Sequence, residues 1–513
     1  MVIYSFKPLI VLGVAAVAAA CILLSRRRPN LREFWSILAG AIIFLIVLSL
    51  APDVLSGNNL ELTLVRFAPG LSLTLRVDSL GLMFALTASF LWILTTIYSI
   101  GYMRSLNEHA QTRYFACFAG AISATMGAAF SGNLLTLYLF YELITMITYP
   151  LVGHKETPEA AAGSKKYIVY LLGTSKAFLL PAVVLTYVIA GTLEFSREGI
   201  LHGGDPMLLT AVYVLFIAGF AKAAIMPLHN WLPSAMVAPT PVSALLHAVA
   251  VVKVGVFSIL RVILYVFGTG MLKDLGLGIL TAYVVSFTII TASVIALTKD
   301  NLKARLAYST ISQLSYIVLG AALLTPSGIT GGVIHITNHA FAKITLFFCA
   351  GSIYAVAHKA NISEMAGIGR KLPITMVAFS IGVLGMIGAP PAGGFATKWY
   401  LALGSMEAGS TVILLVLLVS TVLNAAYFLP VVYTAFFRSP DDAHHGSSLD
   451  PHEDKPPIDT FEGRHGDALH HGGHHEDIKE NPFIAVPLVV SALGSLVLGF
   501  YPDMLLGFVK GIL

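Results

Sequence analysis

Charged residues are scarce in this chain. They make up 11% of its 513 residues, whereas a soluble domain carries about 25%. Hydrophobic residues make up 57%. This balance excludes an ordinary soluble protein and predicts a polytopic membrane protein. The net charge of +4 is small, says little about partners and gives no reason to expect nucleic acid.

Cysteine is also rare, and the sequence lacks the common cofactor motifs. Cys21, Cys117 and Cys349 each lie alone in an apolar segment, without metal or redox spacing, so we interpret them as packing residues. Neither a Gly-rich dinucleotide fingerprint nor a phosphate loop is present. We therefore expect no cofactor and no metal ligands. If a redox reaction drives this protein, another subunit must carry the redox centre, and whether the chain belongs to an enzyme stays open.

Apolar segments dominate what remains, and about fourteen of them approach the roughly 20 residues that span a bilayer. The first has no small-residue cleavage site, so we expect a retained helix rather than a removed signal. Between the second and third segments, alternating side chains around Pro69-Gly70 predict a small extramembrane β-hairpin over residues 53–77. The approximate segment cores are 8–24, 34–51, 79–102, 114–131, 133–152, 166–191, 207–226, 241–266, 276–298, 305–324, 329–356, 373–404, 409–437 and 482–508.

Basic residues gather in every second connection between these segments. The positive-inside rule places such connections in the cytoplasm and both termini on the outer side. We expect a multi-pass protein of a prokaryotic cell (inner) membrane. The odd-numbered connections hold Arg26, Arg27, Arg28, Arg32, Arg104, Arg113, Lys155, Lys165, Lys166, Lys299, Lys303, Arg305, Lys359, Arg370, Lys371, Arg438, Lys455, Arg464 and Lys479.

The thirteenth connection, residues 439–481, is long, hydrophilic and holds half of the 16 histidines. Clustered histidines can bind Zn²⁺ or Ni²⁺. The segment is also rich in Asp and Glu and lacks an apolar set that could fold, so we favour a solvated, mixed-charge loop.

The stretch 216–261 combines two lysines with an interrupted helix. Lys222 lies in an apolar segment that several prolines break, and the next segment carries His247 and Lys253. A charge at the centre of a membrane helix costs about 2.5–3.5 kcal/mol, and non-helical backbone at membrane depth lies inside protein or beside water. The combination predicts a polar path through the membrane. For Lys222, a side chain that snorkels from a helix end is the alternative.

Further ionisable residues lie inside the predicted spans. Three of them recur at i, i+4 and i+8 and therefore line one face of a helix. A lone histidine on an apolar face is usually a satisfied core residue, but three titratable groups on one stripe favour a function. The residues are Glu142, Lys176, His335, His339, Lys343 and Lys398.

Two of the interruptions resemble each other. Residues 219–222 read GFAK at one break and residues 394–398 read GFATK at the other, each beside a Pro-interrupted helix. Interrupted segments at corresponding positions of two halves indicate an internal repeat with a site near the midplane.

The block LHNWLPSAMVAPTPVSALLHAVAVVKVGVF, with Glu142 before it and HITNHAFAKITLFFCAGSI and GGFATKW after it, resembles a known family. The family comprises the antiporter-like subunits of respiratory complex I, the D-type subunits of Mrp-type sodium/proton antiporters and the matching subunits of membrane-bound, energy-conserving hydrogenases. The resemblance covers about residues 78–437. It implies fourteen helices, with helices 4–8 and 9–13 as inverted repeats and with helices 7 and 12 broken.

By position, the resemblance implies that Glu142 pairs with Lys222 and that Lys398 is the terminal group. Burial disfavours a charged lysine and a nearby carboxylate favours it, so Lys222 should hold its proton beside Glu142 and release it without that partner. Some complex I members have Glu where this chain has Lys398, so the lysine favours the other branches of the family. The long lateral helix of the largest complex I member is not expected in this chain. The predicted proton-translocation residues are Glu142, Lys176, Lys222, His247, Lys253, His335, His339, Lys343 and Lys398.

The predicted organisation follows the same scheme. Helices 1–3 with the hairpin occupy 1–112, the two repeats occupy 113–267 and 275–437, the His-rich loop occupies 438–481 and the last helix lies in 482–513.

The predicted function is a proton-translocating subunit of a larger ion-pumping complex, with other membrane subunits, the bilayer and protons as partners. Sodium coupling stays open. The alternatives are a free-standing cation/proton antiporter and a structural scaffold whose buried charges only specify packing.

Overall fold

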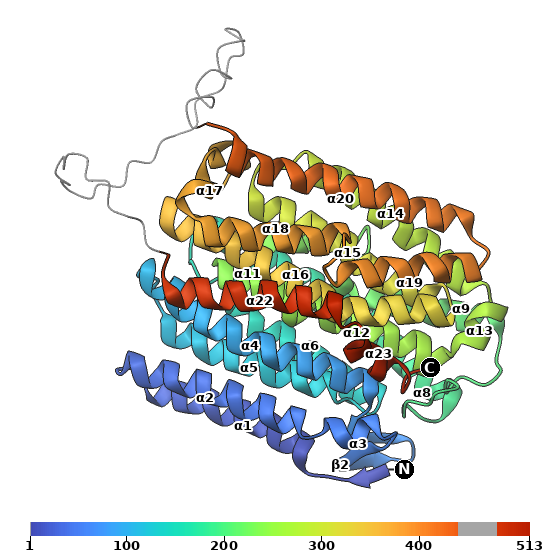
Figure 1. Cartoon of the computed structure of the whole chain (residues 1–513). Helices are drawn as coiled ribbons and strands as arrows, with labels where there is room; N and C mark the ends of the chain where they lie inside the picture. Colours follow the sequence, from blue (N-terminus) through green and yellow to red (C-terminus); the bar gives the residue numbers. More distant parts are fainter. Residues whose placement is uncertain (1, 440–479) are drawn as a thin grey trace, which may run out of the picture.

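The computed structural model describes residues 2–439 and 480–513. Its long helices run side by side along one direction, and the N- and C-termini lie at the same end of the molecule (Figure 1). The His-rich segment lies outside the described residues except at its edges, so the interpretation of that loop stays a prediction.

The N-terminal part combines four helices with a small sheet. The strands β2 (Asn59–Ala68) and β3 (Leu71–Val77) pair antiparallel around Pro69-Gly70, so the predicted hairpin is present. A third strand, β1 (Val2–Tyr4), pairs parallel with β2. The strand has only three residues, which is too short for an alternating apolar and polar pattern to predict it. The helices are α1 (Lys7–Leu24), α2 (Pro29–Leu48), α3 (Ala51–Leu55) and α4 (Ser79–Ser105).

The first broken helix lies in residues 111–274. Three π-helical turns interrupt its helices, and such turns are rare and often lie at functional sites. In order, the elements are α5 (Gln111–Ala129), α6 (Leu134–Val152), α7 (Pro158–Thr174), η1 (Ser175–Leu179), α8 (Leu180–Ala190), α9 (Pro206–Gly219), η2 (Ala221–Ala223), α10 (Trp231–Ser234), η3 (Ala235–Val237), α11 (Thr240–Ala244), η4 (Leu245–Val249), α12 (Val251–Arg261), η5 (Val262–Phe267) and α13 (Thr269–Asp274).

The last part holds the second broken helix and the longest helix of the described chain, α16, with 32 residues. The elements are α14 (Leu277–Leu297), α15 (Leu302–Ala322), α16 (Pro326–Ala357), η6 (Ile362–Met365), α17 (Ile368–Lys371), α18 (Pro373–Ile387), α19 (Gly394–Glu407), α20 (Thr411–Phe437), α22 (Pro482–Phe500) and α23 (Asp503–Val509).

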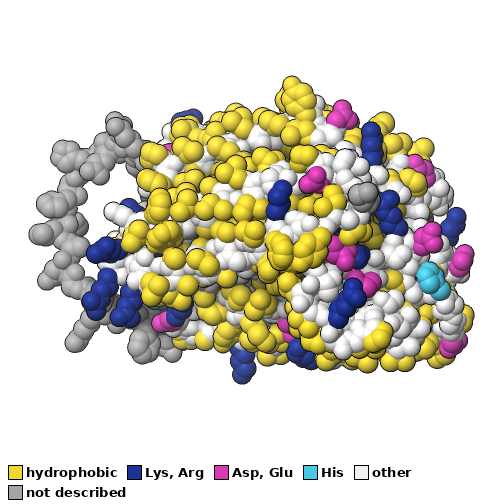
Figure 2. Space-filling model, turned by 90° about the horizontal axis from the view of Figure 1, so that it is seen from below, with side chains coloured by type: hydrophobic (Ala, Val, Ile, Leu, Met, Phe, Trp, Pro, Cys, Tyr) yellow, Lys and Arg dark blue, Asp and Glu magenta, His cyan; other side chains and the backbone are white. Residues whose placement is uncertain are grey.

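Ten helical stretches of the described chain are long and apolar enough to cross a membrane. Figure 2 shows apolar side chains over much of one long face, with most charged side chains toward its two ends. The prediction of a mostly helical, polytopic membrane protein is therefore confirmed. The other predicted spans correspond to α5, α9, α15 and the pair α18–α19, so the count of fourteen, the inverted repeats and the domain division stay predictions.

The helix α7 begins earlier than expected. The sequence predicts a core from residue 166 and places Lys165 and Lys166 in the connection before it. The structure starts the helix at Pro158, where the Thr157 hydroxyl accepts a hydrogen bond from the Ala160 N–H at 3.2 Å. A capped, polar first turn has low hydropathy, which is why the span was predicted too short.

Both predicted interruptions are present, and side chains satisfy the backbone groups that they expose. After α9, the Trp231 indole donates to the carbonyl of Ala221 at 2.9 Å. After α18, the Asn338 amide donates to the carbonyl of Gly393 at 2.8 Å. Buried carbonyls without such donors would destabilise the fold, so these side chains make the breaks tolerable at this depth.

A glycine packs against each break. A Cβ on Gly255 of α12 would lie 2.4 Å from the Ala223 nitrogen, and one on Gly394 would lie 1.9 Å from the carbonyl oxygen of Gly385. Real Cβ atoms do not come that close to backbone. The close approach therefore requires glycine at both positions and fixes where the broken segments lie against their neighbours.

Candidate functional site: a buried lysine and histidine series

The stripe predicted on one helix face meets a second ionisable segment. His335, His339 and Lys343 of α16 are buried, with at most 3% of each residue exposed. Lys253 of α12 is also buried, and its ammonium lies 2.8 Å from Nδ1 of His339. Two segments that are far apart in the sequence thus bring these four predicted residues together.

The helix α15 supplies polar partners for the two ends of this stripe. Nε2 of His335 lies 3.0 Å from Oε1 of Gln313. The Lys343 ammonium donates to the Ser309 hydroxyl at 2.9 Å, and the Tyr427 hydroxyl of α20 donates to the same oxygen at 3.1 Å. The sequence reasoning missed these partners, although Gln313 is a lone amide in an apolar span and could have been singled out.

His247 lies in the π-helical turn η4 and is fully buried. Its ring lies 5.0 Å from the ring of Phe347, and neither ring nitrogen has a hydrogen-bond partner among the described residues. A buried imidazole without partners is costly, so this position calls for a partner such as water.

Lys398 lies at the second break, half-buried, in α19. Its ammonium donates to the carbonyl of Ile387 at 2.6 Å and to the Thr421 hydroxyl at 2.8 Å. Ile387 is the last residue of α18, so the lysine satisfies a carbonyl that the break leaves free and completes the end of that helix.

Lys222 lies at the first break, in η2, and is fully buried. Its ammonium lies 3.4 Å from the centre of the Tyr141 ring and donates to the carbonyl oxygen of Tyr141. The Tyr141 hydroxyl in turn accepts a hydrogen bond from the Lys222 backbone N–H at 3.2 Å. The alternative of a side chain that snorkels outward does not fit this enclosed position.

The expected contact between Glu142 and Lys222 is replaced by another ion pair. Glu142 is buried, and its carboxylate lies 2.9 Å from the ammonium of Lys176. Consecutive helical side chains point about 100° apart, and since Tyr141 faces Lys222, Glu142 faces the π-helical turn η1 that carries Lys176. No ion pair joins Lys222 to a carboxylate in the described part of the chain.

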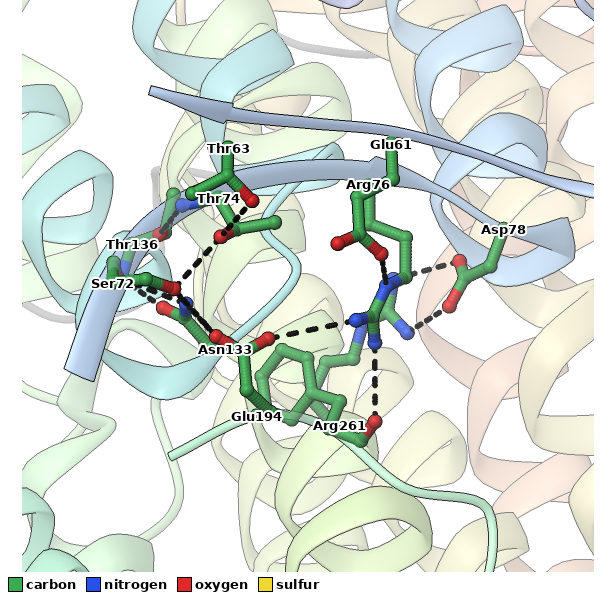
Figure 3. A network of polar contacts seen from close by, with 11 residues as sticks. Glu61, Thr63, Ser72, Thr74, Arg76, Asp78, Asn133, Thr136, Glu194 and Arg261 are labelled. Carbon is green, nitrogen blue, oxygen red and sulfur yellow. Dashed lines mark hydrogen bonds and ion pairs between the residues drawn. The ribbon is translucent and has the colours of Figure 1, made fainter. Parts of the chain in front are cut away.

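A second ionic group lies below the hairpin and was not predicted (Figure 3). The buried Arg261, at the end of α12, donates to both carboxylate oxygens of Asp78, which in turn caps α4 by accepting from the Gly81 N–H at 2.8 Å. Burial raises the pKa of Asp78, but the Arg261 guanidinium, together with the Gly81 N–H and Arg76, leaves that pKa below its ordinary value. Arg261 lies inside the predicted span 241–266, so this charge in an apolar segment is the sequence signal that could have been singled out.

The hairpin itself is tied to the helices by Arg76. Its guanidinium donates to Glu61 at 2.8 Å and to the carbonyl of Phe195 at 3.1 Å, and it lies 3.5 Å from the carboxylate of Glu194. The contacts join β2 and β3 to the segment after α8 (Figure 3). We interpret this network as structural.

These features define a multi-pass membrane protein with a buried lysine and histidine group between two broken helices. Two family models match the chain, one described as "NADH:quinone oxidoreductase/Mrp antiporter, TM" over residues 131–424 and one as "NADH-Ubiquinone oxidoreductase (complex I), chain 5 N-terminus" over residues 69–115. The first model covers more than half of the chain and includes every predicted site residue. The chain belongs to the NADH:quinone oxidoreductase/Mrp antiporter family.

Individual relatives agree with this assignment. The chain is 30% identical to an NADH-quinone oxidoreductase subunit N of Desulforudis audaxviator, over 84% of this chain and 86% of the relative. It is also 30% identical to the A/B subunit of a probable K⁺/H⁺ antiporter of Rhizobium meliloti, over 82% of this chain but only 43% of that longer relative.

Two solved structures share the fold. A chain of the Mrp complex from Dietzia sp. matches with a TM-score of 0.84 and 22% identity, over 99% of this chain and 96% of that one. A chain of the membrane-bound sulfane sulfur reductase, an archaeal respiratory membrane complex, matches with a TM-score of 0.82 and 23% identity, over 99% and 97%. The predicted resemblance to antiporter-like subunits is confirmed.

Proposed function

We propose that this chain is the proton-translocating, antiporter-like subunit of a larger ion-pumping complex in a prokaryotic cell membrane. The observation that carries the proposal is the contact between Lys253 and His339, 2.8 Å apart in the buried interior. Both groups can hold or give up a proton, and hydrogen-bonding partners continue from His339's own helix toward α15 and α20. A scaffold would gain little from burying two titratable groups that attract no opposite charge.

The composition of the central group favours proton transfer. It holds two lysines and three histidines but no carboxylate, so these groups cannot all be charged together, because like charges in a buried site oppose one another. A proton that enters at one end therefore favours release at the other. Water bridging the unpartnered nitrogens of His247 would extend the series. The members of the central group are His247, Lys253, His335, His339 and Lys343.

The two lysines at the breaks are the proposed switching bases, with Glu142 as the modulator. In the described state Glu142 is paired with Lys176, while Lys222 contacts Tyr141. If the driving reaction shifts the carboxylate from Lys176 toward Lys222, Lys222 gains affinity for a proton, and the return shift lowers it. Lys398, held by Ile387 and Thr421, is the proposed terminal group.

A half-exposed charge on an apolar surface supports partner subunits. The Lys176 side chain is 53% exposed, and Leu139, Leu143 and Leu180 are exposed on the flanking α6 and α8. A lysine at such a position would be costly in lipid alone. We therefore propose that another membrane subunit, of an Mrp-type, complex I-like or membrane-bound hydrogenase-like assembly, covers this surface.

Reconstitution of the intact complex in liposomes tests the function. Lys222→Ala is expected to abolish most proton translocation while the complex still assembles, and translocation at the parental rate would refute the assignment. Purified chain alone should not exchange cations for protons; if it does, the free-standing antiporter is the better description.

The central group holds no carboxylate cage for Na⁺ among the described residues, which favours protons as the transported ion. Proton flux in the same vesicles, measured with and without Na⁺, tests this.

A further inference from the structure

A cluster of possible metal ligands lies outside the buried series, where two connections meet. Glu108 and His109 belong to the connection between α4 and α5, and His154 follows the end of α6. One ligand atom from each of the three residues lies within 4.8 Å of the others. His154 is remote in the sequence from the other two residues, so no motif spacing predicted this cluster.

His154 is the member that points to a ligand. Its side chain is fully buried, with an exposed fraction of 0%, and neither ring nitrogen has a hydrogen-bond partner among the described residues. Its ring stacks on that of His109 at 4.8 Å, and Nε2 lies 4.0 Å from a carboxylate oxygen of Glu108. A buried imidazole is normally satisfied, so an unpartnered one beside a carboxylate and a second imidazole points to a ligand at this position.

We propose that Glu108, His109 and His154 form a binding site for a divalent transition-metal ion of the Zn²⁺ type. Two imidazoles and a carboxylate, with water in the fourth position, are a ligand set that Zn²⁺ accepts. Ligand bonds of about 2.0–2.2 Å bring donor atoms to roughly 3.5 Å from one another. The side chain of His109 is 47% exposed and lies 4.0 Å from Glu156, so a small change of its side-chain torsion angles can bring a ring nitrogen to this distance.

A second acidic residue, Glu156, lies near the cluster but is already engaged. Glu156 accepts a hydrogen bond from Arg113 at 2.6 Å, and Arg113 also donates to the carbonyl of His154 at 3.3 Å. The Arg113 guanidinium therefore anchors the connection that carries His154. It leaves Glu108 as the carboxylate available to the ion.

A metal at this position ties the connection between α4 and α5 to the end of α6. Since α6 carries Glu142, ten residues or about 15 Å before its end, the ion would restrain the helix that holds the proposed modulator. The site is independent of the proton-transfer proposal and can be tested without any transport measurement.

Protection of individual histidines from chemical modification tests the site residue by residue. Full-length protein in detergent, stripped with a chelator, is treated with diethyl pyrocarbonate with and without Zn²⁺, and modified histidines are quantified by peptide mass spectrometry. Zn²⁺ at low micromolar concentration is expected to slow modification of His109 about fivefold or more, as binding of the ring nitrogen blocks the reagent. The exposed His202, which is remote from the cluster in the chain, should be modified at the same rate with and without Zn²⁺.

Variants distinguish this site from the histidines in residues 440–479. Glu108→Gln should remove the protection of His109, and His202→Ala should leave it intact. Because peptides report each histidine separately, metal bound elsewhere does not mask the result. An unchanged modification rate of His109 in the presence of Zn²⁺, or full protection in Glu108→Gln, would overturn the proposal. Metal-free unfolding temperatures equal to the parent's confirm that Glu108→Gln is folded.

Discussion

At the scale of single residues, Glu142 lies between two lysines with different surroundings. It forms its ion pair with Lys176, which is half exposed, whereas Lys222 is enclosed by Tyr141. An ion pair at a protein surface can be altered by whatever covers that surface, whereas Lys222 has no ion pair of its own among the described residues. The proposed shift of Glu142 from Lys176 toward Lys222 requires this difference between an exposed and an enclosed lysine.

If Glu142 and Lys176 act as one unit, the losses of proton translocation caused by substituting each residue should not add in the double variant. Glu142→Gln and Lys176→Gln are each expected to remove most proton translocation in the reconstituted complex while assembly is retained. The double variant should be no worse than the worse single variant, because the second change removes nothing further. Proton flux per assembled complex is the measurement. Losses that multiply in the double variant would show that the two residues act separately.

The pair of Arg261 and Asp78 predicts a stability effect. Asp78→Asn leaves the buried guanidinium without its counter-charge, which costs about 3–5 kcal/mol when a buried pair loses one partner. The unfolding temperature of the purified protein should fall clearly. Arg66→Ala, a change at an exposed arginine of the same hairpin, serves as the control and should alter it little. Equal unfolding temperatures for Asp78→Asn and the parent would contradict the importance of the pair.

The same pair predicts a pH dependence. The folded state holds the pKa of Asp78 below its ordinary value. The contribution of Asp78 is therefore fully present above the unfolded value of about 3.9 and is lost as the pH falls below it through the folded value. Unfolding temperatures measured from pH 6 downward should converge for the parent and Asp78→Asn at the acidic end. A constant difference across that range would contradict the prediction.

At the scale of elements, the two breaks depend on close packing of glycines. Gly255 of α12 faces the backbone of η2, so Gly255→Ala forces α12 and the Lys222 segment apart. Overpacking of this kind costs about 1–3 kcal/mol, and translocation should also fall because Lys222 is displaced. Gly270→Ala in α13, where a Cβ meets nothing within 4 Å, is the matched control. Parental stability and transport in Gly255→Ala would show that the close approach does not matter.

The elements also show what the sequence could and could not predict. Hydropathy located most spans, prolines located the two breaks, and the i, i+4, i+8 spacing located the buried face of α16. The structure pairs Glu142 with Lys176 and not with the predicted Lys222. The sequence could not predict this, because the ion pair between α6 and η1 depends on how α6 is rotated about its axis. Gln313, Ser309 and Tyr427 were missed because their role arises only where α15 and α20 pack on α16. The same holds for Glu108 and His154.

At the scale of the whole molecule, the fold places an apolar surface around a polar interior. The described helices expose many large hydrophobic side chains, whereas lysines and histidines are buried along α12, α16 and the breaks. In a soluble protein this arrangement would be unstable, and in a bilayer it keeps these ionisable side chains away from lipid.

The membership of a larger assembly is testable at the same scale. Affinity purification of this chain from its native membrane should recover further membrane subunits in fixed stoichiometry. Chemical cross-linking should place one of them against the surface around Lys176, because a charge is exposed there among apolar residues. Recovery of the chain alone under mild detergent conditions would argue for the free-standing antiporter.

The central claim is that protons pass through the contact between Lys253 and His339. The most direct test is proton flux into liposomes that contain the whole complex with Lys253→Ala, compared with Lys273→Ala, a change at an exposed lysine of α13. The account predicts that the flux falls on the order of 100-fold for Lys253→Ala, as for loss of a proton-transfer group, and stays at the parental rate for Lys273→Ala. Parental flux in assembled Lys253→Ala complex would contradict it.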